Sequence, residues 1–154
     1  MKLYKKESVQ HVNASLEECW TFFSNPKNLQ KITPEEMGFE ITDFDNKSMY
    51  AGQIIQYRVS PLLGLKLSWV SEITFVKEKS YFVDEQLSGP YALWHHKHFF
   101  EANEDGGTKM TDVVHYALPL GFIGRIMNSL VVKNKLKDIF EHRRVTVDKM
   151  FNSK

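Results

Sequence analysis

Histidine and aspartate side chains recur on the predicted inner faces of two neighbouring strands. Trp94, His96 and His98 occupy alternate positions of one strand, and Asp112 and Tyr116 occupy alternate positions of the next. Alternate residues of a strand point to the same face of a sheet, so each set lies on one face. Imidazole and carboxylate groups gathered in this way could move a proton, share a metal ion or hold one another by hydrogen bonds.

The turn between these two strands predicts how they pair. Glu104-Asp105-Gly106 suits a three-residue hairpin loop with glycine in the left-handed position. If Asn103 lies opposite Gly107, the numbers of facing residues sum to 210, which places His98 opposite Asp112. A β-bulge at the turn would instead make these two residues diagonal neighbours. On the preceding strand, Phe82, Asp84 and Gln86 form a matching row.

An arginine lies in the apolar stripe of the last predicted helix, 132–151. The stripe has helical spacing and consists of Val132, Leu136, Ile139, Phe140, Val147, Met150 and Phe151. At 100° per residue, Arg143 falls in the middle of it. A buried guanidinium requires a carboxylate partner, and Asp84 and Asp112 are the candidates. Alternatively, Arg143 extends to solvent at the helix end, or it holds a carboxylate of a bound ligand.

The same residues allow a metal or a catalytic interpretation. His96 and His98 could share a metal ion with Asp84 or Asp112, but no cysteine or further histidine shares the predicted face, so we expect no metal and no cofactor. An enzyme would use His96 or His98 as general base and Tyr116 or Asp112 as proton donor. The chain has no Ser-His-Asp order, phosphate loop, Rossmann glycine pattern or pair of catalytic glutamates.

The elements that must position these residues predict an α+β fold with one domain, 1–154. Ser15 and Glu18 form a capping box before a helix, and Pro26 begins a short second helix. A helical segment at 122–130 precedes the long helix, and a phase shift in the apolar stripe predicts a break between Leu130 and Val132. We predict seven strands, at 3–12, 39–44, 50–60, 65–77, 80–87, 93–103 and 107–118.

The predicted elements follow the order β-α-α-β-β-β-β-β-β-α. Consecutive strands without crossover helices predict an antiparallel sheet, which curves around the C-terminal helix. A loop is expected at 61–64. Alternation along 65–77 predicts one shared face, formed by Leu67, Trp69, Ser71, Ile73 and Phe75. Six apolar residues are expected in the core more often than in a pocket, namely Met37, Phe39, Ile55, Tyr57, Trp69 and Phe82.

Composition excludes several classes of protein. The net charge of +1 on 154 residues argues against a protein that binds nucleic-acid phosphates. No stretch approaches 18 apolar residues, and the first residues lack the apolar run of a signal peptide. A single cysteine, Cys19, excludes an internal disulfide framework and is expected to be buried. We therefore expect a cytoplasmic protein that spans no membrane.

A run of short motifs carries a family resemblance. The motifs are Phe82-x-Asp84-x-Gln86, Gly89-Pro90-Tyr91, Trp94-x-His96-x-His98-x-Phe100, Asp112-x-Val114-x-Tyr116-x-x-Pro119 and Phe140-x-x-Arg143. With this run and its order of elements, nearly the whole chain resembles a bacterial branch of the SRPBCC superfamily, the START-like, helix-grip ligand-binding proteins that include the major birch-pollen allergen. The resemblance implies a helix-grip fold with a cavity between sheet and helix. It implies no particular reaction, because the superfamily includes lipid carriers, hormone receptors, polyketide cyclases and Hsp90 co-chaperones.

We therefore predict a binding protein for a small hydrophobic or amphipathic molecule. The alternative is a polyketide cyclase- or dehydratase-like enzyme acting on a similar molecule, although no cyclase motif is present. A third possibility is a protein-interaction module whose own side chains fill the cavity. The predicted ligand-binding residues are Trp69, Phe82, Asp84, Gln86, Trp94, His96, His98, Asp112, Tyr116 and Arg143.

Overall fold

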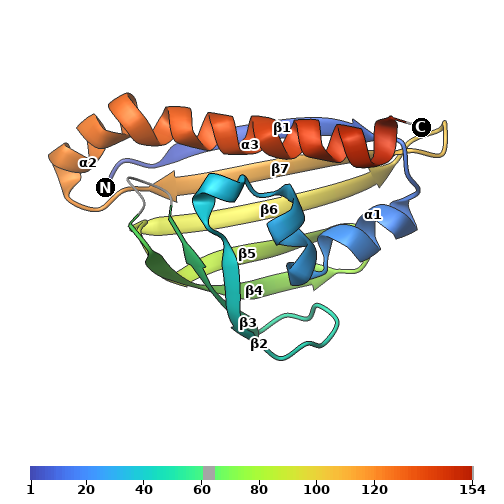
Figure 1. Cartoon of the computed structure of the whole chain (residues 1–154), viewed down its shortest axis with the longest axis horizontal. Coiled ribbons are helices and arrows are strands. Elements are labelled where there is room, and N and C mark those ends of the chain that lie inside the picture. The colour runs from blue at the N-terminus through green and yellow to red at the C-terminus, as the bar shows by residue number, and fades with distance from the viewer. Residues whose placement is uncertain (61–64, 154) are drawn as a thin grey trace.

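A computed structural model describes residues 1–60 and 65–153 of the chain. Seven strands form one antiparallel sheet with the order β1-β7-β6-β5-β4-β3-β2 (Figure 1). The predicted sheet and its antiparallel pairing are confirmed. The strands are β1 Tyr4–Val12, β2 Glu40–Phe44, β3 Gln53–Val59, β4 Leu67–Lys77, β5 Tyr81–Ser88, β6 Leu93–Ala102 and β7 Thr108–Ala117.

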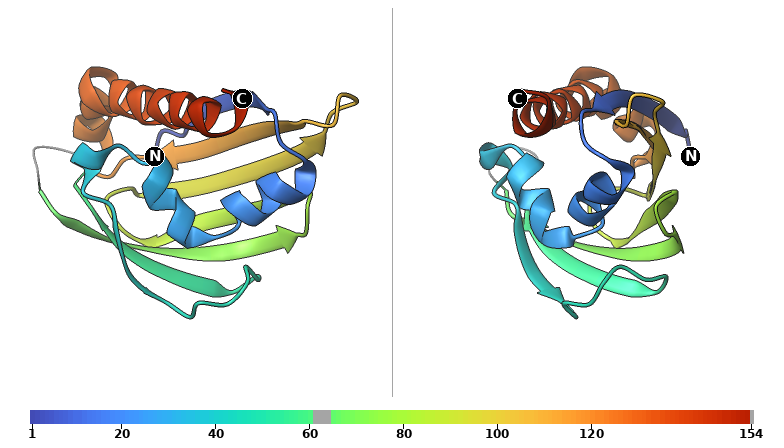
Figure 2. Two further views of the ribbon diagram at one scale, coloured as in Figure 1. Left: turned by 45° about the vertical axis from the view of Figure 1, so that its right-hand side comes forward. Right: turned by 90° about the vertical axis from the view of Figure 1, so that its right-hand side faces the viewer.

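The sheet curves, and the C-terminal helix runs across its concave side, as the end-on view in Figure 2 shows. Several helical segments complete the chain: α1 Leu16–Phe23, two 3₁₀ helices Pro26–Ile32 and Glu35–Met37, α2 Gly121–Met127, a π-helical turn Asn128–Val132, α3 Lys133–Val147 and a last π turn Asp148–Asn152. No helix in the described part of the chain is long and apolar enough to cross a membrane.

The capping box at the start of α1 is confirmed. The Ser15 hydroxyl accepts a hydrogen bond from the Glu18 amide, and the Glu18 carboxylate accepts one from the Ser15 amide. Both bonds satisfy amides that a helix start leaves free. The helix then directs Cys19, Trp20 and Phe23 into a core that also holds Val147 from the end of α3. This core fixes one end of the C-terminal helix against the sheet.

The C-terminal helix continues where the sequence predicts a break, so that prediction is wrong. The chain stays helical from α2 through the π turn into α3 (Figure 1). The residues that face the sheet recur at every fourth position, namely Gly124, Asn128, Val132, Leu136 and Phe140. In a straight α-helix with 3.6 residues per turn such a row would drift around the helix. The i→i+5 spacing of the π turn offsets part of that drift, and it lies where the sequence shows the phase shift.

A β-bulge changes the predicted face of β4. The pairing of β4 with β5 shifts between Ile73 and Phe75, so the alternation of faces is interrupted there. Phe75 therefore does not continue the buried row: its side chain is 44% exposed and stacks on Tyr81. The third predicted strand begins only at Gln53, after Gly52 in a left-handed conformation. The loop predicted at 61–64 lies outside the described residues.

Packing of the C-terminal helix against the sheet is expected to contribute strongly to stability. Leu136 lies at 4% exposure between α3 and the sheet, whereas Leu130 on the same helical rod is 67% exposed. We expect Leu136→Ala to lower the free energy of unfolding by about 2–5 kcal/mol, since it leaves a cavity. Leu130→Ala should change it by less than about 0.5 kcal/mol. Urea denaturation of both variants measures this difference, and equal effects would contradict the observed helix orientation.

Candidate functional site

Three adjacent strands place the predicted polar residues side by side. His98 on β6 faces Asp112 on β7, as the sum of 210 predicts, so this register is confirmed. On the other side of β6, Asp84 of β5 faces His96. The two histidines therefore lie between two aspartates, on the concave face that looks toward the C-terminal helix.

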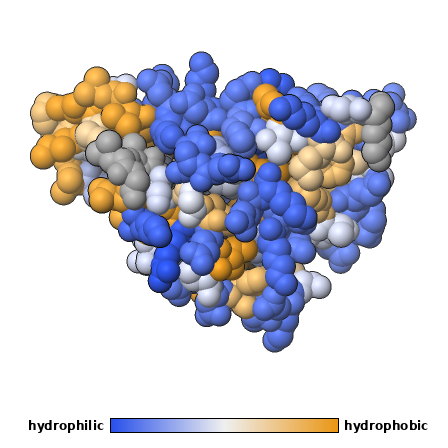
Figure 3. Space-filling view, viewed as in Figure 1, coloured by the Kyte–Doolittle hydropathy of each residue, from blue (hydrophilic) through white to orange (hydrophobic). Residues whose placement is uncertain are grey.

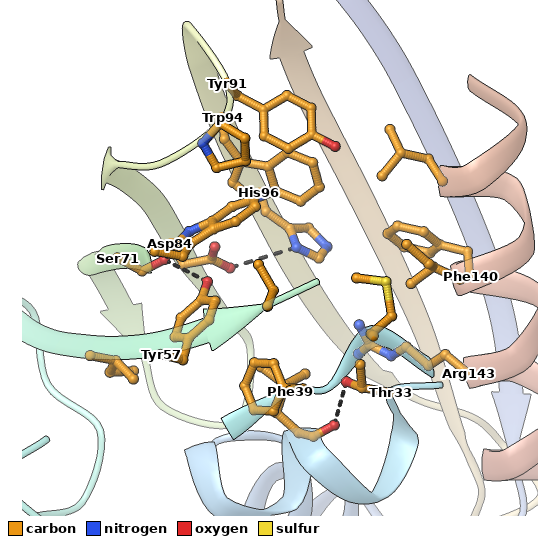
Figure 4. A pocket seen from close by; sticks show the side chains of 18 of the residues that line it. Thr33, Phe39, Tyr57, Ser71, Asp84, Tyr91, Trp94, His96, Phe140 and Arg143 are labelled. Carbon is orange, nitrogen blue, oxygen red and sulfur yellow. Dashed lines mark hydrogen bonds and ion pairs between the residues drawn. The ribbon is translucent and has the colours of Figure 1, made fainter. Parts of the chain in front are cut away.

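The two histidines and two aspartates form a buried hydrogen-bonded cluster. His98 Nε2 lies 2.7 Å from Asp84 Oδ2, and His96 Nε2 lies 3.0 Å from Asp112 Oδ1. His96 Nδ1 lies 3.6 Å from Asp84 Oδ2, the contact drawn in Figure 4. His98 Nδ1 is 2.9 Å from Asp112 Oδ1, but off the direction that a hydrogen bond requires. Each imidazole thus touches both carboxylates.

Arg143 reaches this cluster from α3. Its Nη1 lies 3.6 Å from Asp112 Oδ1, and its guanidinium carbon lies 5.4 Å from the centre of the Phe23 ring. The side chain is nearly buried, so it does not extend to bulk solvent. Of the two predicted partners, Asp112 forms the ion pair, while Asp84 is engaged by the histidines. The pair joins the C-terminal helix to β7, next to the edge strand β1.

The positive groups keep both aspartates ionised. Burial raises the pKa of Asp112, but Arg143 and the two histidines outweigh burial and hold the pKa well below its usual value. Burial also raises the pKa of Asp84, and the hydrogen bond and charges of the histidines again outweigh it, so that the pKa is lowered. Two carboxylates therefore carry negative charge in the interior of the protein, which is stable only with matching positive charge.

The pKa values of the two histidines shift in opposite directions. Burial lowers the pKa of His96, and the neighbouring His98 lowers it further, so this imidazole stays neutral. Burial also lowers the pKa of His98, but Asp112 and Asp84 outweigh burial and raise it. With His98 protonated, the cluster contains two negative aspartates and two positive groups, His98 and Arg143. It then has no net charge.

Asp84, His96 and His98 could also serve as metal ligands by geometry. Their ligand atoms all lie within 4.8 Å of one another. However, Asp84 already accepts the short hydrogen bond from His98, and Arg143 supplies positive charge beside Asp112. A divalent cation would have to displace a proton and would add charge to a balanced cluster. The arrangement therefore favours internal hydrogen bonding over metal coordination.

The cluster borders a cavity of about 400 Å³ between the concave face of the sheet and the C-terminal helix. Figure 4 shows its side chains converging from both sides: Tyr57, Asp84 and Trp94 from the strands, Phe140 and Arg143 from α3. Most of the lining is apolar. The cavity thus has mostly apolar walls, one cluster of ionisable side chains formed by Asp84, His96, His98 and Arg143, and one further basic residue, Lys135.

Aromatic rings form the wall on the sheet side. Tyr57 stacks on Trp69 at 5.7 Å, and Trp69 packs edge-to-face on Trp94 at 5.3 Å between ring centres. The Tyr57 hydroxyl and the Trp69 ring nitrogen both meet the Ser71 hydroxyl at 3.0 Å. Because their polar atoms are satisfied by Ser71, these rings present only apolar surface to the cavity.

Seven of the ten residues predicted for ligand binding line the cavity: Trp69, Phe82, Asp84, Trp94, His96, His98 and Arg143. The other three lie behind its wall. Gln86 bonds the backbone of Tyr91, Asp112 supports the histidines and Arg143, and the Tyr116 hydroxyl donates to Asn128. The residues expected mainly in the core, such as Phe39 and Tyr57, line the cavity as well.

Sequence reasoning missed a second wall, which the first helical segments supply. Leu29 and Ile32 reach the cavity from the 3₁₀ helix, Thr33 reaches it from the position after that helix, and Lys135 reaches it from α3. The spacing of Leu29 and Ile32 indicates an apolar side of a short helix, but not what that side covers. Tyr91 also lines the cavity; the Gly89-Pro90-Tyr91 motif was the only signal for it.

Solved structures share this architecture over nearly the whole chain. The Zhui aromatase/cyclase from Streptomyces sp. R1128 is 11% identical, with a TM-score of 0.68 over 97% of this chain and 96% of that one. Ara h 8.0201 is 15% identical, with a TM-score of 0.60 over 95% and 98%. Protein CV1439 from Chromobacterium violaceum is 10% identical, with a TM-score of 0.72 over 97% and 99%.

At these identities the likeness shows the fold, and the predicted helix-grip fold is confirmed. No protein-family model and no curated protein sequence matches the chain. Function must therefore be argued from the cavity and its charged cluster.

Removing one member of the charged cluster is expected to destabilise the protein. Asp112→Asn leaves Arg143 without its ion-pair partner, and Arg143→Met leaves Asp112 with less positive charge. We expect each to lower the free energy of unfolding by about 3–5 kcal/mol. Asp138→Asn, an exposed change on the same helix, is the matched control and should have little effect. Thermal and urea denaturation measure this, and unchanged melting temperatures would show that no buried ion pair exists.

The stability of the protein should fall on both sides of about pH 6.5, the ordinary pKa of histidine. His98 faces Asp84, Asp112, His96 and Arg143, and its pKa is raised. The stability that its protonation contributes is therefore lost as pH rises from 6.5 through the raised pKa. His96 has a lowered pKa, so stability is lost as pH falls below 6.5, and further acid protonates the aspartates. The measurement is the free energy of unfolding in urea between pH 5 and 8.5.

We attribute the decrease in the free energy of unfolding above pH 6.5 to the loss of the proton from His98. We expect it to disappear in His98→Asn, while the slope in His115→Asn stays as in the unmodified protein, because the pKa of His115 is lowered and not raised. The comparison uses the slope with pH, so a constant loss of stability in either variant does not affect it. An unchanged alkaline slope in His98→Asn would contradict a protonated His98.

Proposed function

We propose that the protein binds a small amphipathic molecule in the cavity between the curved sheet and the C-terminal helix. The observation that carries this proposal is a cavity of about 400 Å³ with mostly apolar walls and one charged cluster. Ligand pockets of proteins typically have volumes of about 300–1,000 Å³, apolar walls and a few polar groups that fix orientation. A cavity filled by the protein's own side chains, as in an interaction module, would leave no such space.

The free donors of Arg143 predict the polar group of the ligand. A guanidinium has five N–H donors. Among residues 1–60 and 65–153, that of Arg143 forms the 3.6 Å ion pair with Asp112 and lies over the Phe23 ring, but it makes no hydrogen bond. Its donors are therefore available to an acceptor in the cavity. Because the cluster is already neutral with His98 protonated, a carbonyl or hydroxyl oxygen fits better than a carboxylate, which would add a buried negative charge.

The length of the cavity predicts the shape of the apolar part. Its lining residues on the C-terminal helix run from Ile123 to Arg143, which spans about 30 Å at 1.5 Å per residue. A modest volume distributed along this length suits an extended chain better than a compact ring system. We infer an aliphatic or lightly branched chain with one oxygen group at the end near Arg143.

The positions of the histidines argue against the enzyme alternative. A general base must have a ring nitrogen free to meet the substrate. In His96 both ring nitrogens face carboxylates, and in His98 one is bonded to Asp84 while the other lies against Asp112. Both rings are oriented by the protein rather than by the cavity. Binding is therefore better supported than cyclase- or dehydratase-like chemistry.

Binding can be measured with the protein's own tryptophans, because Trp69 and Trp94 line the cavity. The probes are 1-decanol, decanoate and decane, which share a chain length and differ in the polar group. We expect 1-decanol to bind most tightly and to change tryptophan fluorescence in a saturable way. A hydrogen bond to a charged donor is worth about 1.5–3 kcal/mol, so the preference over decane should be about tenfold or more.

The role of Arg143 is tested against its neighbour. Arg143→Lys keeps the charge but loses the planar donors, and Arg143→Met loses both; either should reduce the preference for decanol. Arg144→Met is the matched control, because Arg144 is exposed and pairs with Glu141 and Asp148. If no probe binds, and native mass spectrometry of the purified protein finds no co-purified molecule, the proposal is contradicted.

A further inference from the structure

A patch of exposed apolar side chains covers the surface around α2. It consists of Leu120, Phe122, Ile123, Ile126, Met127 and Leu130, which are between 39% and 73% exposed. Figure 3 shows it as the orange area at the end of the molecule where Figure 1 places α2. We call these six residues the α2 patch. An apolar cluster of this kind on a protein surface indicates an interaction site.

The helix presents this patch outward because its other side is fixed against the protein. Phe122, Ile126 and Leu130 recur at helical spacing on one side, whereas Gly124 and Asn128 are buried on the other. A methyl group at Gly124 would overlap the Pro119 carbonyl oxygen, so the helix packs there at backbone distance. Asn128 accepts a hydrogen bond from the Tyr116 hydroxyl at 2.9 Å. The apolar side of this helix therefore faces away from the core, the reverse of an ordinary surface helix.

Leu120 supports a role for the patch. It is the most exposed of the six and has a φ of 64°, in the left-handed region. Glycine or asparagine would adopt this backbone conformation at lower energetic cost. A leucine in this conformation, with its side chain largely in solvent, receives little stabilising contact from the described residues of the chain. Its apolar surface is explained if a partner covers it.

The charges around the patch indicate the chemistry of that partner. From Val113 to Lys137 the chain has no aspartate or glutamate and four basic residues, Arg125, Lys133, Lys135 and Lys137. With 20 basic and 19 acidic residues in all, the rest of the chain has a net charge of −3. Arg125 and Lys133 form no ion pair with any described residue. An apolar surface whose neighbours along the chain are basic and not acidic matches an anionic surface with an apolar interior.

Part of the patch also borders the cavity. Leu120, Ile123 and Met127 are exposed to solvent and line the cavity at the same time. A partner that covers the patch therefore covers this edge of the cavity as well. A partner bound at the patch would therefore lie directly beside the interior of the cavity.

We propose that the α2 patch docks on the surface of an anionic phospholipid bilayer. Phe122, Ile126 and Leu130 enter the interface between head groups and chains, and Arg125 and Lys133 meet lipid phosphates. A second copy of the chain fits less well, because a symmetric pair would bring the same basic residues together. Exchange of a ligand between bilayer and cavity rests on the proposed function, whereas docking itself does not.

Vesicle flotation tests the docking surface. Purified full-length protein is mixed with vesicles of phosphatidylcholine alone or of an equimolar mixture with phosphatidylglycerol. We expect it to float with the anionic vesicles, to bind the neutral ones weakly, and to be released by high salt, which screens surface charge. Phe122→Ser with Leu130→Ser should reduce binding about tenfold or more, because two inserted side chains are lost. Lys133→Gln with Arg125→Gln should reduce binding only to the anionic vesicles.

The control is a pair of exposed apolar residues elsewhere, Val9→Ser with Leu87→Ser, which should float like the unmodified protein. The Phe122 and Leu130 side chains do not line the cavity, so this variant should still bind 1-decanol; loss of vesicle binding alone then separates docking from ligand binding. Equal flotation of the patch variant and the unmodified protein would overturn the proposal. So would a lipid-free dimer, seen by sedimentation velocity, that the patch substitutions dissociate while no form binds vesicles.

Discussion

The ion pair between Arg143 and Asp112 determines how the C-terminal helix sits on the sheet. A guanidinium near the middle of an apolar helix face can be buried only where a carboxylate meets it, and Asp112 is held in place by two histidines. Burying one of these charges alone would cost several kcal/mol. Many rotations of an apolar helix on a sheet bury similar apolar area, but few also bring Arg143 to Asp112. The charged cluster therefore selects one arrangement among several that packing alone would allow.

The same cluster borders the cavity because its side chains are directed toward one another within the wall. His96 and His98 hold their rings in the direction of the carboxylates, with ring centres 3.7 Å apart, rather than toward α3. The aromatic wall of Tyr57, Trp69 and Trp94 is likewise fixed by Ser71 and by ring contacts. Neither wall can collapse onto the helix without losing hydrogen bonds. The cavity is thus a consequence of polar constraints that are met within the walls.

The features that could be predicted from the sequence are those that depend on local geometry. The hairpin loop and the two-residue period of a strand are enough to place His98 opposite Asp112, and the helical period is enough to turn Arg143 inward. Asp84 and Asp112 could not be ranked as partners, because that depends on the height of the helix over the sheet. Phe75 was misplaced because a bulge leaves no mark in the alternation of apolar residues. The wall formed by Leu29 and Thr33 depends on tertiary packing, which no short-range pattern specifies.

The π turn links the interior of the protein to its outer surface. A row of residues at every fourth position, from Gly124 to Phe140, can face the sheet only if the helix is locally widened, and Asn128–Val132 supplies that widening. If the helix kept a strict 3.6-residue period, aligning Leu136 and Phe140 with the sheet would rotate Gly124 away from Pro119. A larger residue than glycine could then occupy that position, and the apolar side chains at 122 and 126 would turn toward the protein. Closing the cavity along α3 and exposing apolar residues at its edge are therefore two results of the same local departure from α-helical geometry.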